Sequence, residues 1–361
     1  MRTHSDTPTD ARRAYSRRLT RLRLVLLILL LLVLLLSVIC MNAGASPIPP
    51  RDILRALFTG DGSTNSRIVR SIRLPRVLAA LCAGAGLSLS GCIMQNVLRN
   101  PMASPSTLGV SNAAVFGANF AIVVLGAGGF HSTHGETVSI SDPYSVTLCA
   151  FLCALGASLL ILGLSARRGF RAETVVLAGS ALGALFSAAT TVVQYFAMDT
   201  QVAAAVFWTF GDLGRATLRE DLLILTVTAL SLIYFLLHRW DYNAMAAGEE
   251  TARTLGVRTA RVRFASLLLS SVICAVSVSF LGIIGFLGLA APQLARRLVG
   301  EDHRFLLPAS TLCGMALLLF ADTLSRSLLR GISLPVGAIT SLLGGPVLLW
   351  MLFCRKGGDL S

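Results

Sequence analysis

The stretch AAGEETARTLGV, residues 246–257, is a short polar segment set between two long apolar runs, 218–238 and 263–281. A glycine stands near each of its ends, at Gly248 and Gly256. In a chain made mostly of apolar runs, a polar insert of this kind adds nothing to stability in lipid. We therefore expect the segment to contact a partner in water.

The charges of this segment favour a short helix. Glu249 and Glu250 lie near its start, where negative charge meets the positive end of the helix dipole. Arg253 follows Glu249 by four residues, a spacing that pairs opposite charges on one helix face. Gly256 suits a left-handed C-terminal cap. The alternative is an ordinary loop between two helices.

The apolar runs around this segment determine the fold class. The chain has 361 residues, of which 54% are hydrophobic and only 14% charged, whereas a soluble domain carries roughly 25% charged residues. Continuous runs of about 20 apolar residues are typical of transmembrane helices, because backbone groups in lipid must be paired within the segment. We predict an all-α polytopic membrane protein with about ten transmembrane helices. The expected spans are 22–42, 73–98, 107–126, 144–165, 174–198, 218–238, 263–281, 286–298, 304–328 and 335–354. The eighth is short and interrupted by Pro292, so the alternative for this run is a helix that does not cross fully.

The basic residues between the runs predict the orientation. The net charge is +13, and all but one of the 31 basic residues are arginines. Such charge can indicate nucleic-acid binding, but here it lies in short segments between apolar runs, which fits the positive charge of cytoplasmic loops. We expect membrane lipid around the chain, no nucleic-acid partner and both termini in the cytoplasm. Arginines in 43–76, on the expected outer side, depart from the rule and suggest an acidic partner outside.

The same runs predict the domain organisation. Residues 1–21 are expected to form a basic cytoplasmic tail, 22–354 a single transmembrane domain, and 355–361 a cytoplasmic C-terminal tail. The first run is longer than the roughly 7–15 apolar residues of a signal peptide, so it is interpreted as a retained span. Residues 50–58, PRDILRALF, predict a short amphipathic helix on the outer surface.

The common signatures of catalysis are missing from the sequence. There is no GxxxxGK[ST] phosphate loop, no HExxH and no GxSxG. We therefore expect that the chain does not hydrolyse ATP by itself, so that any energy from ATP would come from a separate subunit. The eight cysteines lie mostly in apolar runs without a CxxC pair and are interpreted as small buried side chains. His131 and His134, in HSTHGE, could bind a metal or haem iron, but exposure of a polar loop is the simpler interpretation.

Small residues crowd several of the runs. Gly84 and Gly91 lie in the second run, and Gly179 and Gly183 form a GxxxG in the fifth. Small side chains let helices approach closely in lipid, so helix packing is the expected use. The alternative is that these positions line a pathway wide enough for a bulky ligand.

Four segments occur together in one order: RLPR at 73–76, RNPMASPSTLGVSN at 99–112, the polar segment at 246–257 and GIIGFLGLAAPQLARRLVGEDHRFLLPAS at 282–310. With these segments the chain resembles the permease subunits of the iron–siderophore, haem and cobalamin group of ABC importers, the FecCD type with the type II importer fold. The resemblance implies transport of a ferric siderophore first, then haem or cobalamin, across the inner membrane of a prokaryote.

The same resemblance implies the partners of the chain. They are a second copy of itself enclosing one pathway, two cytoplasmic ATP-binding subunits, and one periplasmic or lipoprotein substrate-binding protein. ATP and Mg would be bound by the partner ATPase, and this chain would hold no cofactor or metal. In relatives, the segment at about 241–257 forms the coupling helices that fit a groove on the ATPase. The coupling residues implied here are Gly248, Glu249, Glu250, Arg253 and Gly256.

Arginines on the outer side are candidates for docking. Arg73 and Arg76 flank Pro75, and Arg326 lies near the outer end of the ninth run. A guanidinium group suits bidentate pairing with carboxylates, and in the resembling permeases these arginines meet glutamates of the substrate-binding protein. One alternative is that they anchor helix ends at the interface. Another, for Arg326, is an intrahelical pair with Asp322, four residues earlier.

The inner end of the second run is the candidate gate. Gln95 and Asn96 lie close to this end, and prolines in the following RNPMASPS break the helix. In relatives this turn helps to form the inner gate, which implies that role for Asn100 and Met102 and places Gln95 and Asn96 beside the pathway. Where relatives commonly have a histidine, this chain has Gln293, so no histidine role is expected there.

A carrier driven by an ion gradient is the alternative from another class. Such carriers often keep ionisable groups at mid-membrane and show inverted repeats with broken helices. The sequence shows neither an obvious duplication nor a carboxylate well inside a run. These observations favour the ATP-driven importer.

Overall fold

The computed structural model describes residues 8–44, 48–58, 63–129, 139–140, 142–167, 172–328 and 333–353. Nearly all of its elements are helices, with one hairpin of two-residue strands. The elements in chain order are α1 (Pro8–Asn42), α2 (Pro50–Phe58), α3 (Thr64–Ile68), the π-helix η1 (Val69–Arg73), α4 (Leu74–Val97), α5 (Val110–Val123), β1 (Gly128–Gly129), β2 (Ser139–Ile140), α6 (Pro143–Ala166), α7 (Ala172–Tyr195), α8 (Asp199–Thr209), the 3-10 helix η2 (Leu213–Arg215), α9 (Leu218–Leu237), α10 (Arg239–Ala247), α11 (Glu249–Thr254), α12 (Thr259–Leu281), α13 (Leu287–Val299), α14 (His303–Ser327) and α15 (Val336–Phe353).

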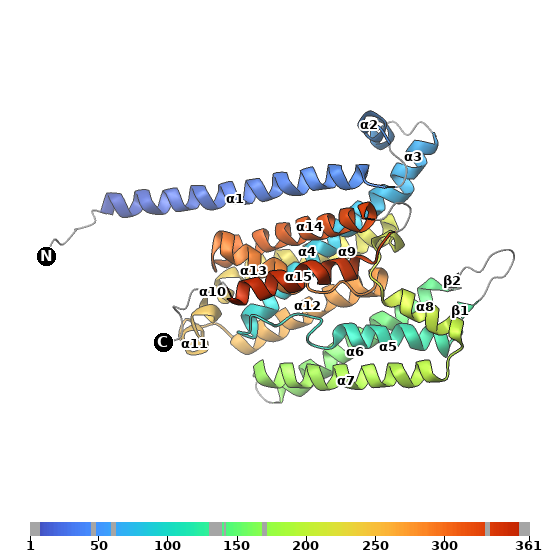
Figure 1. Cartoon of the computed structure of the whole chain (residues 1–361). Coiled ribbons are helices and arrows are strands. Elements are labelled where there is room, and N and C mark those ends of the chain that lie inside the picture. The colour runs from blue at the N-terminus through green and yellow to red at the C-terminus, as the bar shows by residue number, and fades with distance from the viewer. Residues whose placement is uncertain are drawn as a thin grey trace.

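The long helices run side by side in one bundle (Figure 1). Two further apolar helices, Val110–Val123 and Val336–Leu349, are shorter than the long ones. Each of the ten predicted runs contains one helix, so the predicted all-α polytopic membrane fold is confirmed. Among the described residues, seven helices are long and apolar enough to cross a membrane: Tyr15–Asn42, Thr64–Val97, Pro143–Ala166, Glu173–Tyr195, Leu218–Leu237, Thr259–Leu281 and His303–Ser327.

The eighth predicted run forms a helix that is too short to cross a bilayer. This helix, α13, has 13 residues, which at 1.5 Å per residue is about 20 Å, against roughly 30 Å of hydrocarbon. Its backbone enters from Phe286, which has φ +62°. The chain therefore places α13 as a short helix inside the bundle, packed on α4 and α14.

Helix α4 forms the centre of the bundle. Every residue from 82 to 97 is buried, and α9, α12, α13 and α14 pack around it. A Cβ placed on Gly84 would lie 2.7 Å from the carbonyl oxygen of Gly314, and one on Gly91 would overlap the carbonyl of Gly288. The prediction that the glycines serve helix packing is confirmed at these positions.

The outer helices present apolar side chains over most of their surface. Leu31 of α1, Leu177 of α7 and Leu230 of α9 are each more than half exposed. Such continuous apolar surface is stable only against lipid or another apolar surface. The chain is therefore a membrane-embedded protein.

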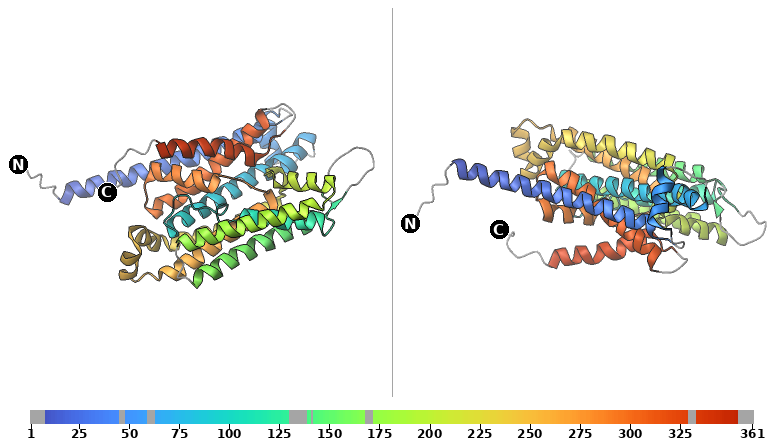
Figure 2. Two further views of the ribbon diagram at one scale, coloured as in Figure 1. Left: turned by 60° about the horizontal axis from the view of Figure 1, so that its bottom comes forward. Right: turned by 90° about the horizontal axis from the view of Figure 1, so that it is seen from above.

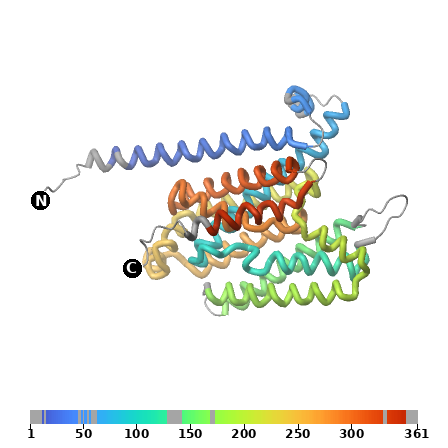
Figure 3. The backbone as a smooth tube through the Cα atoms, in the orientation of Figure 1, coloured from blue at the N-terminus to red at the C-terminus, as the bar shows by residue number. Residues whose placement is uncertain are grey.

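The two ends of the bundle differ in what they carry (Figures 1 and 3). The start of α1, the pair α10–α11 and the end of α15 lie at one end, which we call the inner end. The opposite end, called the outer end, carries α2, α3 and the β1–β2 hairpin. Figure 2 shows α1 leaning along one side of the bundle, so that its first turns extend past the inner end.

The structure locates the helix predicted at 50–58 but does not describe two other predicted segments. The amphipathic helix predicted at 50–58 is α2, which buries Ile53 and Ala56. His131 and His134 lie outside the described residues, as does the C-terminal tail 355–361.

Candidate functional sites at the two ends of the bundle

The polar segment 241–257 contains two short helices that meet at Gly248. Helix α10 ends at Ala247, and Gly248 takes φ +140°, a backbone conformation that favours glycine. Helix α11 follows, and Gly256, with φ +83°, stands just beyond its end. The short helix predicted between two glycines is therefore present. The two glycines fix the direction in which α11 leaves and rejoins the bundle.

Glu249 connects α11 to the body of the bundle. Its Oε1 accepts a hydrogen bond from Arg253 at 2.7 Å, and its Oε2 lies 3.4 Å from Nη2 of Arg263 in α12. Partial burial opposes ionisation of Glu249, but the charges of Arg263 and Arg253 outweigh it and hold the pKa of this carboxyl below its ordinary value. The exposed Glu249–Arg253 pair adds about 0.3–0.5 kcal/mol at most.

The face of α11 turned away from the bundle is exposed. Glu250 and Arg253 are exposed there, and the neighbouring Leu255 is 68% exposed. On the opposite face Ala252 is fully buried. The helix therefore rests on the bundle through a small side chain and offers acidic, basic and apolar groups to water.

A cavity of about 520 Å³ opens at the inner end, beside this segment. The four residues predicted for the pathway and gate all line it, so residues 95–102 belong to one site. Its lining is Gln95, Asn96, Arg99, Asn100, Pro101, Met102, Ala246, Gln293, Arg296, Arg297, Glu301, His303, Leu306 and Leu348.

Gln95 is the polar centre of the cavity wall. Its Oε1 accepts hydrogen bonds from Nη1 of Arg296 at 2.5 Å and from Nε2 of Gln293 at 3.4 Å. Its own Nε2 donates to the carbonyl of Gly288 at 3.2 Å. Gln293 also donates to the carbonyl of Pro101 at 3.1 Å. The Gln95 amide therefore joins the end of α4 to α13, and the Gln293 amide joins α13 to the turn after α4.

The turn after α4 is held by local bonds. Arg99 adopts φ +47°, a left-handed conformation that costs about 1 kcal/mol or more for a residue with a Cβ. Asn100 accepts the backbone N–H of Met102 through Oδ1 at 2.9 Å. Asn96 donates to the carbonyl of Tyr242 in α10 at 3.3 Å. The candidate gate is therefore a constrained turn in contact with the polar segment.

Sequence reasoning missed several residues of this inner site. The sequence shows Gln293 only as a departure from relatives, and Arg296 only as one of two arginines at the end of the eighth run. Arg263 gave no signal beyond its position at the start of an apolar run. A spacing argument could have suggested Gln293 and Arg296, since residues three apart share a helix face.

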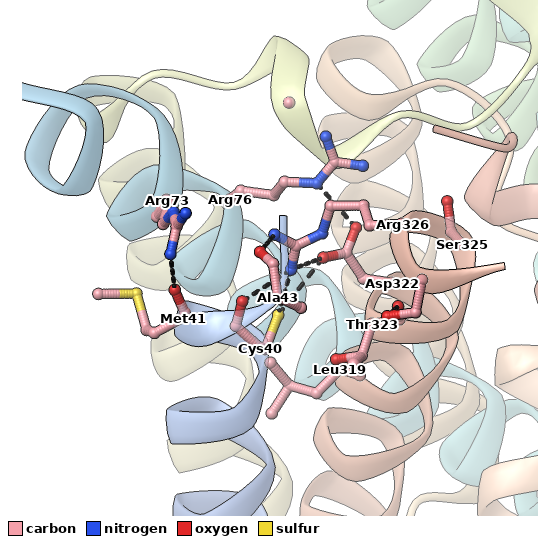
Figure 4. A network of polar contacts seen from close by, with 12 residues as sticks. Cys40, Met41, Ala43, Arg73, Arg76, Leu319, Asp322, Thr323, Ser325 and Arg326 are labelled. Atoms are coloured by element: carbon pink, nitrogen blue, oxygen red, sulfur yellow. Dashed lines mark hydrogen bonds and ion pairs between the residues drawn. The ribbon is translucent and has the colours of Figure 1, made fainter. Parts of the chain in front are cut away.

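At the outer end, Arg73 is buried inside the chain. Only 4% of it is exposed, and its Nη1 donates to the carbonyl of Met41 at 2.7 Å and to that of Asn42 at 3.4 Å. These carbonyls end α1 and have no partner within their own helix. Arg73 therefore caps α1 from the side, as Figure 4 shows.

Asp322 is the centre of the outer network (Figure 4). Its fully buried carboxylate lies 2.8 Å from Nε of Arg76 and 2.7 Å from Nη2 of Arg326. The thiol of Cys40 donates to the same carboxylate at 3.4 Å, and Arg326 donates to the carbonyl of Ala43 at 2.6 Å. Helices α1, α4 and α14 therefore meet through one carboxylate.

The three arginines predicted for docking are thus bound within the chain. The alternative weighed for Arg326, an intrahelical pair with Asp322, is present. Side-chain exposure is only 11% for Arg76 and 10% for Arg326. Contact of these arginines with an external protein stays a prediction, and it would require the network to open.

Comparison with known proteins places this architecture in a family. The FecCD transport family matches residues 29–354. An ABC transporter permease protein of Methanocaldococcus jannaschii is 46% identical over 315 residues, which is 87% of this chain and 90% of the relative. The hemin transport system permease protein HmuU of Yersinia pestis is 37% identical over 286 residues, 79% of this chain and 83% of the relative.

Further relatives are named as vitamin B12 and iron chelatin permeases. A solved structure, an inward-facing conformation of a metal-chelate-type ABC transporter, superposes with a TM-score of 0.77 at 29% identity and covers 92% of this chain and 99% of its own. These relatives are permease subunits that act within ABC transporter complexes. The chain belongs to the FecCD transport family and is an ABC importer permease.

Proposed function

We propose that this chain forms the membrane pathway through which a metal chelate enters the cytoplasm, with ATP hydrolysed by a separate subunit. One observation carries the proposal: the cavity lined by Gln95, Asn96, Asn100 and Met102 is also lined by Ala246 of α10, the helix that leads directly into the exposed helix α11. A gate and a helix available to a cytoplasmic partner thus lie next to each other. That arrangement suits a passive pathway that is moved from the cytoplasmic side.

The proposal includes the partners of the chain. Two copies would enclose one pathway, two ATP-binding subunits would contact α10 and α11 from the cytoplasm, and one external binding protein would deliver the cargo. ATP and Mg would reside in the ATPase, and this chain would carry out no reaction of its own. The inner end would then face the cytoplasm of a prokaryote, with both termini on that side.

The cargo we propose is an iron chelate, with a ferric siderophore first, then haem, and cobalamin as the alternative. The names of the relatives support this range. The cavity adds a charge argument, because Arg99, Arg296 and Arg297 line it against one acid, Glu301. A cationic wall favours chelates that carry carboxylates or other negative groups.

The external contact has two sets of candidate arginines. Arg73, Arg76 and Arg326 remain the proposed docking residues on the strength of the family resemblance. Arg51 of α2 and Arg67 of α3 are exposed at the outer end in this structure. Acidic groups on the binding protein could reach the second set without disturbing Asp322, which provides a direct comparison.

Reconstitution tests the function. The chain would be purified with its ATPase subunit in liposomes, and uptake of a ferric siderophore, haem and cobalamin would be measured with the binding protein present. We expect uptake that requires both ATP inside and binding protein outside. Uptake by this chain alone, driven by a proton or sodium gradient, would instead show a secondary carrier.

A further inference from the structure

Arg263 joins the polar segment to the central helix. It lies in the first turns of α12 and is only 6% exposed. Its Nε donates to the carbonyl of Val97 at 2.9 Å, while its Nη2 lies 3.4 Å from Oε2 of Glu249 in α11. A single guanidinium group therefore contacts α11 on one side and α4 on the other.

The contact on α4 falls where the helix gives way to the candidate gate. Val97 is the last residue of α4, and the strained Arg99 follows two residues later. Asn100 and Met102, which line the cavity, come next. A displacement of the Val97 carbonyl therefore displaces the start of the gate turn.

A second contact joins the same helix end to α10. Asn96 donates to the carbonyl of Tyr242, and the hydroxyl of the fully buried Tyr242 lies 2.7 Å from that of Ser266 in α12. Helices α4, α10 and α12 are thus fixed to one another. Helix α11 packs on α10 and α12, and the Glu249–Arg263 pair is its ionic contact with a spanning helix.

We propose that Arg263 is the positioning residue through which a movement of α11 reaches the gate turn at residues 98–102. A guanidinium group is a planar fork that holds two acceptors in a fixed relation. Since Arg263 is buried, leaving its charge without Glu249 is costly, so a shift of α11 moves Arg263 and the carbonyl of Val97 with it. The proposal rests on the proposed function and identifies the link inside it.

A merely structural role would give a different result. An arginine at the inner end of a span can simply anchor that end, and its loss would then lower stability without altering the ratio of transport to ATP hydrolysis. A link between α11 and the gate predicts normal ATP hydrolysis with reduced uptake. The ratio of chelate imported to ATP hydrolysed is therefore the deciding measurement.

The experiment uses the reconstituted complex with its ATPase and binding protein. The variants are Arg263→Gln, Glu249→Gln and the double variant, with Arg261→Gln as control because Arg261 is exposed on the same helix. We expect Arg263→Gln and Glu249→Gln each to lower the transport-to-ATP ratio about three- to ten-fold. The double variant should lower it no further than the larger single effect, because both changes break one chain of contacts. The control should leave the ratio unchanged.

Arg263→Lys sharpens the test. An ammonium group can satisfy Glu249 or the Val97 carbonyl but lacks the fork that holds both, so the variant should fold like the wild type and still lower the ratio. If Arg263→Gln does not fold, Glu249→Gln and Arg263→Lys decide the matter alone. Ratios equal to wild type in these variants, or additive losses in the double variant, overturn the link. Failure of the wild-type complex to import any chelate with ATP would instead overturn the proposed function.

Discussion

The two ends of this protein use charge in opposite ways. At the outer end, Arg76 and Arg326 converge on the buried carboxylate of Asp322. At the inner end, Glu250 and Arg253 face water, and Glu249 is shared between an exposed and a buried arginine. Buried charge holds helices in place, whereas exposed charge is available to a partner. The comparison suggests a fixed outer junction and an inner end that can move.

The largest effect is expected from breaking the outer junction. Asp322→Ala would leave Arg76 and Arg326 buried without their common counter-charge, which we expect to cost about 3–5 kcal/mol. Thermal unfolding of the purified protein in detergent measures this loss. Asp212→Asn is the matched control, because Asp212 is 42% exposed and lies 3.5 Å from Arg76, so its loss should cost less than about 1 kcal/mol. Equal effects of the two changes would contradict the idea of a fixed junction.

The second largest effect is expected on uptake when charge is reversed at the inner end. Replacing Glu249 by lysine places a third positive charge beside Arg253 and Arg263 and should reduce uptake about ten-fold or more, because 1.4 kcal/mol of repulsion corresponds to a factor of ten. Glu250→Lys, on the exposed face, should act only if the ATPase contacts that face. ATP-driven uptake and ATP hydrolysis measured together would separate the two variants. Normal uptake with both lysines present would refute the coupling assignment.

A smaller effect should distinguish the two sets of outer arginines. Replacing Arg51 and Arg67 by glutamate should weaken binding of the external protein by a few-fold, because exposed ion pairs contribute about 0.2–1 kcal/mol each. The loss should shrink at high salt, where exposed charges are screened. Binding of the purified external protein to the permease in nanodiscs provides the measurement. If the variant with both arginines replaced bound the external protein as well as the wild type, Arg73, Arg76 and Arg326 would remain the candidate docking residues.

The smallest effect is a pH dependence at the inner end. Because the pKa of Glu249 is lowered in the folded chain, its pairs stabilise α11 above the ordinary carboxyl pKa and are lost as the pH falls through the lowered value. The protection factors of the α11 amides, which are exchange rates corrected for the intrinsic pH dependence of amide exchange, should therefore be unchanged between pH 8 and pH 6 and should fall in more acidic solution. In Glu249→Gln this acid dependence should disappear. If the α11 amides of Glu249→Gln still lost protection to the same extent in acid, another titrating group would be responsible.

Much of the bundle could be predicted because lipid imposes simple rules. Continuous apolar runs located every spanning helix, and the glycines around 246–257 located α11. The candidate gate residue Gln95 could be named because it lies near a helix end, whereas Met102 was implied by the family resemblance; both line one cavity. Local sequence was sufficient for the helices and for Gln95.

Long-range pairing could not be predicted. Arg76 and Asp322 are 246 positions apart, and no local pattern shows that two charges so distant will neutralise each other. Arg263 and Val97 are 166 positions apart, so the link to the gate was likewise invisible. Such features follow from how helices pack rather than from their own residues. The short length of α13, by contrast, was indicated by its sequence, because the run is short and contains Pro292.

The position of α1 has a consequence for how the protein is made. This helix packs mainly on α14, and its last carbonyls are held by Arg73 and Arg326. During synthesis, α1 is complete about 260 residues before translation of α14 begins. It must therefore enter the bilayer on its own apolar character before its neighbour exists, and the leucine-rich second half of the helix makes it stable there as a solitary span. Docking onto the finished bundle is then a late step of assembly within the membrane.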